Sequence, residues 1–176
     1  MSTDLKRRNV PFSPPDMTEA EANEVRDTIL SGWITTGPRT KKLEKLISEY
    51  VGTEKTVCLN SATAAMEMVL HVLGVGSGDE VIMPAYTYTA SASVVDHVGA
   101  TIKMVDIRKA GSSDEDQDFE MDYEKLAEAI TERTKVVVPV DLAGICANVD
   151  KIMEVITRPE ILAKFTPAND IQKLIG

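Results

Sequence analysis

The sequence has few of the residues that build disulfide scaffolds, metal centres or membrane spans. Among 176 residues there are only two cysteines, Cys58 and Cys146, and they form no CxxC pair. With only two histidines, a histidine-based metal site is not expected. No apolar run approaches the ~20 residues needed to cross a bilayer. We therefore expect two reduced, buried thiols in a cytoplasmic protein without a metal or a membrane partner.

Basic side chains are also scarce relative to acidic ones. The chain has 19 Lys and Arg side chains against 28 Asp and Glu side chains, which gives a formal charge of -9. An acidic chain repels phosphate backbones, so nucleic acid is not an expected partner. The N-terminus carries basic residues without a following apolar stretch, so no signal peptide is expected.

The hydrophobic pattern predicts alternating strands and helices after a helical N-terminal segment. Thr18 and Glu21 form a capping box that opens a first helix, and Gly52 ends a second, amphipathic helix. Strands are then expected at residues 56–59, 80–83, 102–105 and 135–140, and helices at residues 64–73, 89–98 and 123–130. This alternation favours an α/β fold with a largely parallel, buried sheet.

The acidic stretch from Ala110 to Met121 is expected to be a solvated loop, because clustered like charges repel one another. Within it, residues 114–118 resemble the start of a calcium loop. However, Phe119 stands where an EF-hand needs Gly, and Lys125 stands where it needs Glu. A calcium site is therefore not expected.

Residues 59–65, with the sequence LNSATAA, carry the strongest local signal for a binding site. An expected strand ends there, a turn of small hydroxyl residues follows, and a helix begins. The first helical amides have no intrahelical partners and the helix dipole is positive at that end, which suits a phosphate. Ser61 and Thr63 add hydroxyl donors. The alternative is that Ser61 only caps the helix, and the local pattern alone favours this plain cap.

Three further segments could contact a ligand. Tyr86 and Tyr88 follow an expected strand, at the edge where parallel sheets bind ligands, and could stack on a planar ring or pack in the core. Asp141 also follows a strand, and its carboxylate could face the same edge or cap a turn. The loop at residues 33–38 holds the only Trp, which could contact a sugar or cover the core between two helices.

Taken together, these segments resemble one family. The order GWITTGP, LNSATAAMEMVL, LGVGSGDEVIMPAYTYTASA, GATIKMVDI, ITERTKVVVPVDLAG is similar to the pyridoxal-phosphate-dependent sugar aminotransferases of the DegT/DnrJ/EryC1/StrS group. The resemblance implies an incomplete fold-type I large domain, a mostly parallel sheet flanked by helices, in a homodimer with its site at the subunit interface. It implies pyridoxal 5′-phosphate (PLP) as cofactor, and a nucleotide-linked keto sugar and an amino-acid donor, usually glutamate, as substrates.

The resemblance also implies which residues bind the cofactor. Ser61, Ala62 and Thr63 match the family's S-x-T segment, although the family often has Gly in the middle. Thr63 and Ala64 would hold the phosphate of PLP. Tyr88 matches the aromatic residue that stacks on the pyridine ring.

For the substrate, the resemblance points to the loop that contains Trp33, Ile34, Thr35 and Thr36, which matches the family's GW-x-T-x-G segment. Within this loop, the resemblance gives Thr35 as the first candidate for a substrate contact. Asp141 replaces a histidine that is common in the family and stands beside the site rather than in contact with the cofactor.

Two residues that the resemblance requires for catalysis match no position of the chain: the aspartate that pairs with the pyridine nitrogen and the Schiff-base lysine. Residues 165–172 resemble an insertion that some members carry before that aspartate. We expect a helical segment at residues 1–54 and a partial α/β cofactor-binding large domain at residues 55–176, without the C-terminal half of that domain and the small domain.

The leading hypothesis is therefore the N-terminal portion of a sugar aminotransferase. It would be inactive by itself, because transamination needs the lysine and the aspartate. We also expect it to bind PLP weakly or not at all. One alternative is a PLP-dependent sugar dehydratase of the same group, in which a histidine replaces the lysine. The other is a non-catalytic α/β remnant or binding module.

Overall fold

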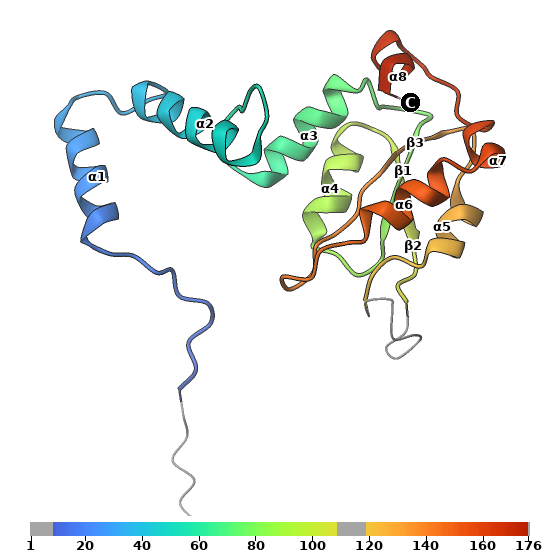
Figure 1. Cartoon of the computed structure of the whole chain (residues 1–176), viewed down its shortest axis with the longest axis horizontal. Coiled ribbons are helices and arrows are strands. Elements are labelled where there is room, and N and C mark those ends of the chain that lie inside the picture. The colour runs from blue at the N-terminus through green and yellow to red at the C-terminus, as the bar shows by residue number, and fades with distance from the viewer. Residues whose placement is uncertain (1–8, 109–118, 176) are drawn as a thin grey trace, which may run out of the picture. The chain divides into compact units, whose positions relative to one another are not determined.

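The structure, a computed structural model, describes residues 9–108 and 119–175. The chain divides into two compact units, of which the first ends at Cys58 and the second begins at Leu59. Figure 1 labels the elements, which are α1 (Glu19–Leu30), α2 (Pro38–Val51), α3 (Ala62–Val72), β1 (Glu80–Pro84), α4 (Thr89–His97), β2 (Thr101–Val105), α5 (Tyr123–Ala129), β3 (Thr134–Val137), α6 (Val149–Ile156), α7 (Pro159–Leu162) and α8 (Asp170–Ile175).

The first unit contains α1 and α2, whose ends follow from local sequence. The capping box is confirmed, because the Glu21 carboxylate accepts a hydrogen bond from the Thr18 amide at 2.7 Å while the Thr18 hydroxyl accepts one from the Ala20 amide at 3.2 Å. Gly52 ends α2 with a φ of 73°, a left-handed conformation that glycine adopts without strain. The predicted pair of N-terminal helices is therefore present.

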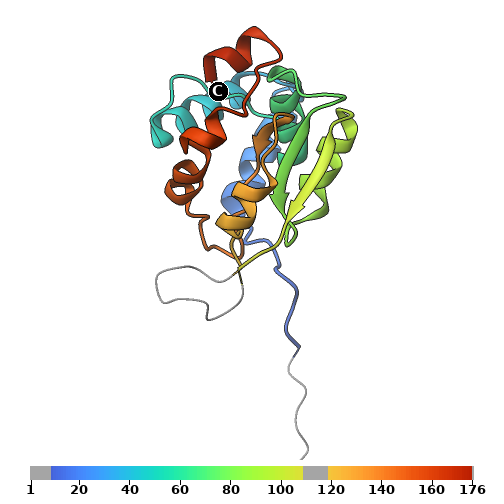
Figure 2. The ribbon, with the colours of Figure 1, turned by 90° about the vertical axis from the view of Figure 1, so that its right-hand side faces the viewer.

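The second unit is built on a parallel sheet with the strand order β2-β1-β3 in the described residues. β1 pairs with β2 from Glu80 opposite Thr101 to Pro84 opposite Val105, and with β3 on its other side. The chain moves from β1 to β2 in one direction and from β2 to β3 in the other. Because crossovers between parallel strands are right-handed, their helices α4 and α5 lie on opposite faces of the sheet, as Figure 2 shows.

Each face of β1 is buried in a separate apolar cluster. On one face, Val81 and Met83 pack against α3 and α4, and on the other, Ile82 packs against α5, α6 and α7. The first cluster contains Leu70, Val75, Val81, Met83, Val94 and Val95, and the second contains Ile82, Val105, Met121, Leu126, Ile130, Ile152, Val155 and Ile161. The predicted α/β fold with a parallel sheet flanked by helices is confirmed. Burial on both faces holds for the central strand β1, whereas the edge strand β2 is mostly exposed.

The expected strand at residues 56–59 is wrong, since these residues form no strand in the structure. A strand needs a neighbour to complete its hydrogen bonds, and in the described part of the chain this segment has none. The Cys58 amide donates instead to the Glu44 carboxylate at 3.0 Å. The last expected strand is too long, because β3 ends at Val137, two residues before Pro139, which has no N–H to donate.

Two other expectations need correction. Residues 109–118 lie outside the described part of the chain, but Glu120 and Met121, expected in a solvated loop, are buried. Met121 pairs with Ile107 in an antiparallel bridge, which draws the end of the acidic stretch into the core. Both cysteines are free, yet Cys146 is exposed and Cys58 only half-buried, so their expected burial is wrong. Among the described residues, no helix is both long and apolar enough to cross a membrane.

Candidate functional site

The sheet topology brings two of the predicted site residues to one edge. The loop after β1 leads to α4 on one face of the sheet, whereas the loop after β3 leads towards α6 on the other face. β1 and β3 are neighbours, so the connections diverge between their carboxyl ends. Ligands of open parallel sheets bind outside such a point of divergence. Tyr88 follows β1 and Asp141 follows β3, so both belong to this edge.

The N-terminus of α3 is the predicted phosphate cradle. Ser61 is its cap, and the Ser61 hydroxyl accepts a hydrogen bond from the Ala64 amide at 3.1 Å. Ser61 thus caps the helix, and this cap leaves the amides of Ala62 and Thr63 as first-turn donors without intrahelical acceptors. Ser61 and Ala62 are exposed, while Thr63 and Ala64 are half-buried. Small side chains at an exposed helix start leave these donors open to an anion.

Tyr88 is the N-cap of α4, and the residue is 81% exposed. Tyr86 is also largely exposed and packs beside Phe119, with ring centroids 6.0 Å apart and planes tilted by 57°. The alternative that both tyrosines fill the core is therefore wrong. α3 and α4 pack against one another, so the phosphate cradle and the Tyr88 ring start neighbouring helices on the same face of the sheet.

Asp141 caps a turn, the second of its two predicted interpretations. Its carboxylate accepts a hydrogen bond from the Ala147 amide at 2.8 Å. Within this loop, Leu142 and Ile145 exchange backbone hydrogen bonds across Ala143 and Gly144, whose φ angles are 51° and 85°. Two positive φ angles in succession are typical of a type I′ turn. Asp141 therefore fixes the shape of a loop at the carboxyl-terminal edge of the sheet, to which Tyr88 also belongs.

The Trp33 loop belongs to the first unit and is closed on itself. The indole nitrogen of Trp33 donates to the Thr36 carbonyl oxygen at 3.1 Å, and a Cβ at Gly37 would overlap the indole ring. Ile34, Thr35 and Thr36 are exposed. The indole thus shapes the loop, and the two threonine hydroxyls stay accessible to a polar ligand.

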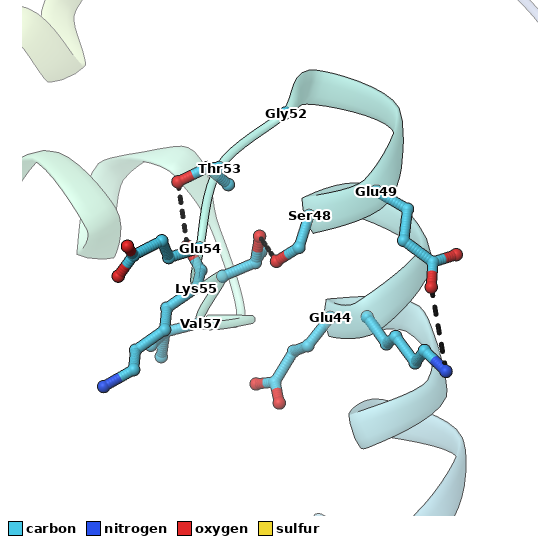
Figure 3. Close-up of a pocket in the computed structure, with 10 residues that line it drawn as sticks. Glu44, Ser48, Glu49, Gly52, Thr53, Glu54, Lys55 and Val57 are labelled. Atoms are coloured by element: carbon cyan, nitrogen blue, oxygen red, sulfur yellow. Dashed lines mark hydrogen bonds and ion pairs between the residues drawn. The ribbon is translucent and has the colours of Figure 1, made fainter.

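A second feature of the first unit is a polar pocket that sequence reasoning missed. It has a volume of about 550 Å³ and lies between α2 and the segment after Gly52 (Figure 3). Its hydroxyl groups are already paired: the Ser48 and Thr56 hydroxyls lie 2.8 Å apart, and the Thr53 hydroxyl donates to the Lys55 carbonyl. These contacts hold the segment against α2 and do not leave a set of converging donors for a phosphate.

Sequence reasoning also missed a buried carboxylate at the opposite, amino-terminal edge of the sheet. The Glu80 side chain is 3% exposed and accepts hydrogen bonds from Arg133 at 2.6 Å and Thr131 at 2.7 Å. Lys103 and Thr134 lie at 3.5 and 3.3 Å. Burial acts to raise the pKa of Glu80, but the Thr131 hydroxyl and the charges of Lys103 and Arg133 outweigh it and lower this pKa below its ordinary value.

A second buried carboxylate, Glu120, joins α5 to α6. It accepts hydrogen bonds from the Tyr123 hydroxyl and from the Asn148 amide, the latter at 3.0 Å. Burial, followed by the hydrogen bond to Glu120, raises the pKa of Tyr123 well above its ordinary value. Among the described residues, no group of three or more Asp, Glu, His or Cys side chains could hold a metal ion.

Comparison with known proteins places this architecture among known relatives. Residues 15–163 match the DegT/DnrJ/EryC1/StrS aminotransferase family. Spr1654 of Streptococcus pneumoniae, provisionally assigned as a sugar aminotransferase, is 57% identical in its PLP-form, with a TM-score of 0.85 over 94% of this chain and 40% of that chain. The UDP-4-amino-4-deoxy-L-arabinose–oxoglutarate aminotransferase of Shewanella sediminis is 39% identical over 153 residues, which are 86% of this chain and 37% of that protein.

A sugar dehydratase is also similar. GDP-4-keto-6-deoxymannose-3-dehydratase, solved with a trapped PLP-glutamate geminal diamine, is 25% identical, with a TM-score of 0.75 over 87% of this chain and 39% of that chain. The present chain thus spans about two fifths of the length of the relatives it matches. The match over residues 15–163 covers most of the 176 residues, and the fold corresponds to the large domain of fold-type I sugar aminotransferases. The chain belongs to the DegT/DnrJ/EryC1/StrS aminotransferase family.

Proposed function

We propose that this chain supplies the N-terminal part of the cofactor site of a PLP-dependent aminotransferase that acts on a nucleotide-linked keto sugar, with glutamate as the amino donor. The observation that carries the proposal is the pairing of two helix starts. α3 begins at the small-residue cradle capped by Ser61, and α4, packed against it, begins at the exposed ring of Tyr88.

The residues present fit the cofactor. The amides of Ala62 and Thr63 and the hydroxyls of Ser61 and Thr63 would hold its phosphate, and the positive end of the α3 dipole favours the negative charge. The resemblance gives Ala64 as a phosphate contact beside Thr63, but the Ala64 amide already donates to the Ser61 hydroxyl and keeps the first turn in place, so we propose the Ala62 amide instead. The Tyr88 ring would orient the pyridine ring by stacking on it. When bound, PLP supplies an electron sink for the reacting carbon.

Substrate and donor are proposed from the relatives. The Shewanella enzyme acts, by its name, on a UDP-linked amino sugar and oxoglutarate, and the dehydratase structure holds glutamate on PLP. The exposed hydroxyls of Thr35 and Thr36 are the proposed sugar contacts, with Trp33 shaping their loop. We further propose the division at residues 1–54 and 55–176, a cytoplasmic location and a homodimer. Asp141 is proposed to support the site through the turn it caps.

Phosphate recognition can be tested with the 176-residue chain, ¹⁵N-labelled and titrated with PLP. We expect weak, saturable shifts of the Ala62 and Thr63 amides. Pyridoxal, which lacks the phosphate, should not reproduce them. Thr63→Val keeps the side-chain shape and removes one hydroxyl donor to a charged group, so the Kd for PLP should rise about tenfold.

The matched control is Thr101→Val, the same change at an exposed position at the amino end of β2, opposite to the cradle. It should leave the Kd unchanged. Equal binding of pyridoxal and PLP, or an unchanged Kd in Thr63→Val, would rule out phosphate binding at this helix start. The same chain mixed with glutamate and a keto sugar should show no amino transfer, since the lysine that the family uses matches none of its residues.

The similarity to a sugar dehydratase supports a second candidate function. The two enzymes differ at the position of the Schiff-base lysine, where the dehydratases of this group have a histidine. The gene sequence downstream of the codon for Gly176 therefore separates them. A stop codon there would instead favour the non-catalytic module. Its candidate surface is the edge of β3, which has no partner strand among the described residues and lies beside an apolar groove of about 520 Å³.

A further inference from the structure

Two amide side chains from the C-terminal part of the chain form hydrogen bonds with the C-terminal end of α3, which lies away from the phosphate cradle. Asn169 Nδ2 donates to the Leu73 carbonyl oxygen at 2.9 Å, and Gln172 Nε2 donates to the same oxygen at 2.8 Å. Leu73 is the C-cap of α3, so no backbone amide of the helix donates a hydrogen bond to its carbonyl oxygen. Both of its lone pairs are used by side chains almost a hundred positions further along the chain.

These two side chains are held in place by bonds of their own. The Gln172 side chain belongs to a residue that is 3% exposed, and its Oε1 accepts a hydrogen bond from the Ala168 amide at 2.7 Å. The Asn169 Oδ1 accepts a hydrogen bond from the Gln172 amide at 2.9 Å. Gly74 has a φ of 67°, and a Cβ there would overlap the Asn169 amide. The Asn169 amide can therefore reach the Leu73 carbonyl only because the next residue is a glycine.

The segment that carries Asn169 and Gln172 is itself tied to the rest of the second unit. Lys135, in β3, donates to the Thr166 carbonyl oxygen at 2.6 Å, and Lys164 donates to the Ile130 carbonyl oxygen at 3.0 Å. The segment resembles a family insertion, and the proposed function leaves it without a role. In the structure it links the C-terminus of α3 to β3 and to the end of α5.

We propose that Asn169 and Gln172 are positioning residues for the cofactor phosphate, acting through α3. The inference rests on the proposed function. A helix of 11 residues is a stiff rod about 16 Å long, so a displacement of its last carbonyl is transmitted to its first amides. The two donors also offset the negative end of the helix dipole, whose positive end faces the phosphate.

The double variant N169D/Q172E tests this. Each new carboxylate is the same size as the amide it replaces and retains the acceptor oxygen that bonds the residue-172 or residue-168 amide. Both donors to Leu73 are lost, and the carboxylate oxygens that replace them repel the Leu73 carbonyl oxygen. Lys173→Glu is the matched control, because it changes the net charge by the same two units at an exposed position in α8, next to Gln172. The single variants N169D and Q172E serve if the double variant does not fold.

Two readouts are taken at a temperature well below unfolding. In the PLP titration, the Kd of the double variant should rise about tenfold, and Lys173→Glu should match the parent chain. In amide hydrogen exchange, the Ala65 amide, which bonds to the Ser61 carbonyl at the far end of α3, should exchange about tenfold faster in the double variant only.

A lower unfolding midpoint with unchanged PLP affinity and unchanged exchange at Ala65 would show that the contact only stabilises the fold, and would overturn the proposal. If the parent chain gives no saturable PLP response, this chain does not form the phosphate site by itself. The exchange at Ala65 then still decides whether Asn169 and Gln172 control the start of α3.

Discussion

Replacing Glu80 with alanine is expected to lower the free energy of unfolding of the second unit by about 3 kcal/mol. The Glu80 carboxylate is almost fully buried and bonds groups from both neighbouring strands, Lys103 from β2 and Thr134 from β3. Alanine leaves the hydroxyls of Thr131 and Thr134 without this acceptor. Arg133 is largely exposed and can return to water, which keeps the cost below that of stranding a buried cation.

Glu80 should also make the free energy of unfolding depend on pH. The pKa of Glu80 is lowered in the folded chain, so its ionised form contributes stability above the pKa of the unfolded chain. That contribution is lost as the pH falls through the folded pKa. The difference in unfolding free energy between the parent and Glu80→Gln should therefore be largest near neutral pH and shrink as the pH falls below about 4.3.

Urea unfolding followed by circular dichroism measures both the cost of Glu80→Ala and the pH dependence seen with Glu80→Gln. Each variant should show a lower urea midpoint than the parent, with an unchanged slope. Glu124→Gln is the control, because its ion pair with Arg158 has a largely exposed carboxylate and should contribute less than about 0.5 kcal/mol. Equal midpoints for Glu80→Ala and Glu124→Gln would show that the Glu80 network adds no net stability.

The sheet was predictable because its signal is local. Glu80 to Met83 reads as a short strand bounded by Pro84, and a central parallel strand buries both faces, so its apolar residues run together rather than alternate. Helix ends were predictable for the same reason, since the Thr18 cap and the Gly52 stop depend on neighbours within a few residues. The strand expected at residues 56–59 failed because pairing depends on a distant partner, which its own residues do not specify.

The candidate site was predictable only as a set of residues. The resemblance selected Thr63 and Tyr88, and the fold adds that they start two packed helices. The contacts that hold this arrangement were not visible. Nothing near Leu73 in the sequence indicates that its carbonyl meets Gln172, and nothing in the acidic stretch indicates that Glu120 is buried. Such contacts join residues far apart in the chain, and hydrophobic periodicity carries no information about them.

Ile82→Ala should be the most damaging core substitution in β1, with an expected cost of about 3–4 kcal/mol. Ile82 is fully buried on the central strand and packs against α5, α6 and α7. Removing its outer atoms costs the lost burial and leaves a cavity between rigid neighbours. Ile102→Ala, on the edge strand β2 where the residue is 36% exposed, should cost about 1 kcal/mol by the same measurement.

The effect of Ile82→Ala should reach the opposite face of the sheet, because β1 belongs to both apolar clusters. Val81 and Met83 alternate with Ile82 along one strand, so neither cluster can lose that strand alone. Urea unfolding followed by methyl NMR signals of Val94 in one cluster and Leu126 in the other should therefore show one common midpoint, lowered equally by the substitution. A lowered midpoint at Leu126 with an unchanged one at Val94 would mean that the two faces unfold independently, and that β1 does not couple them.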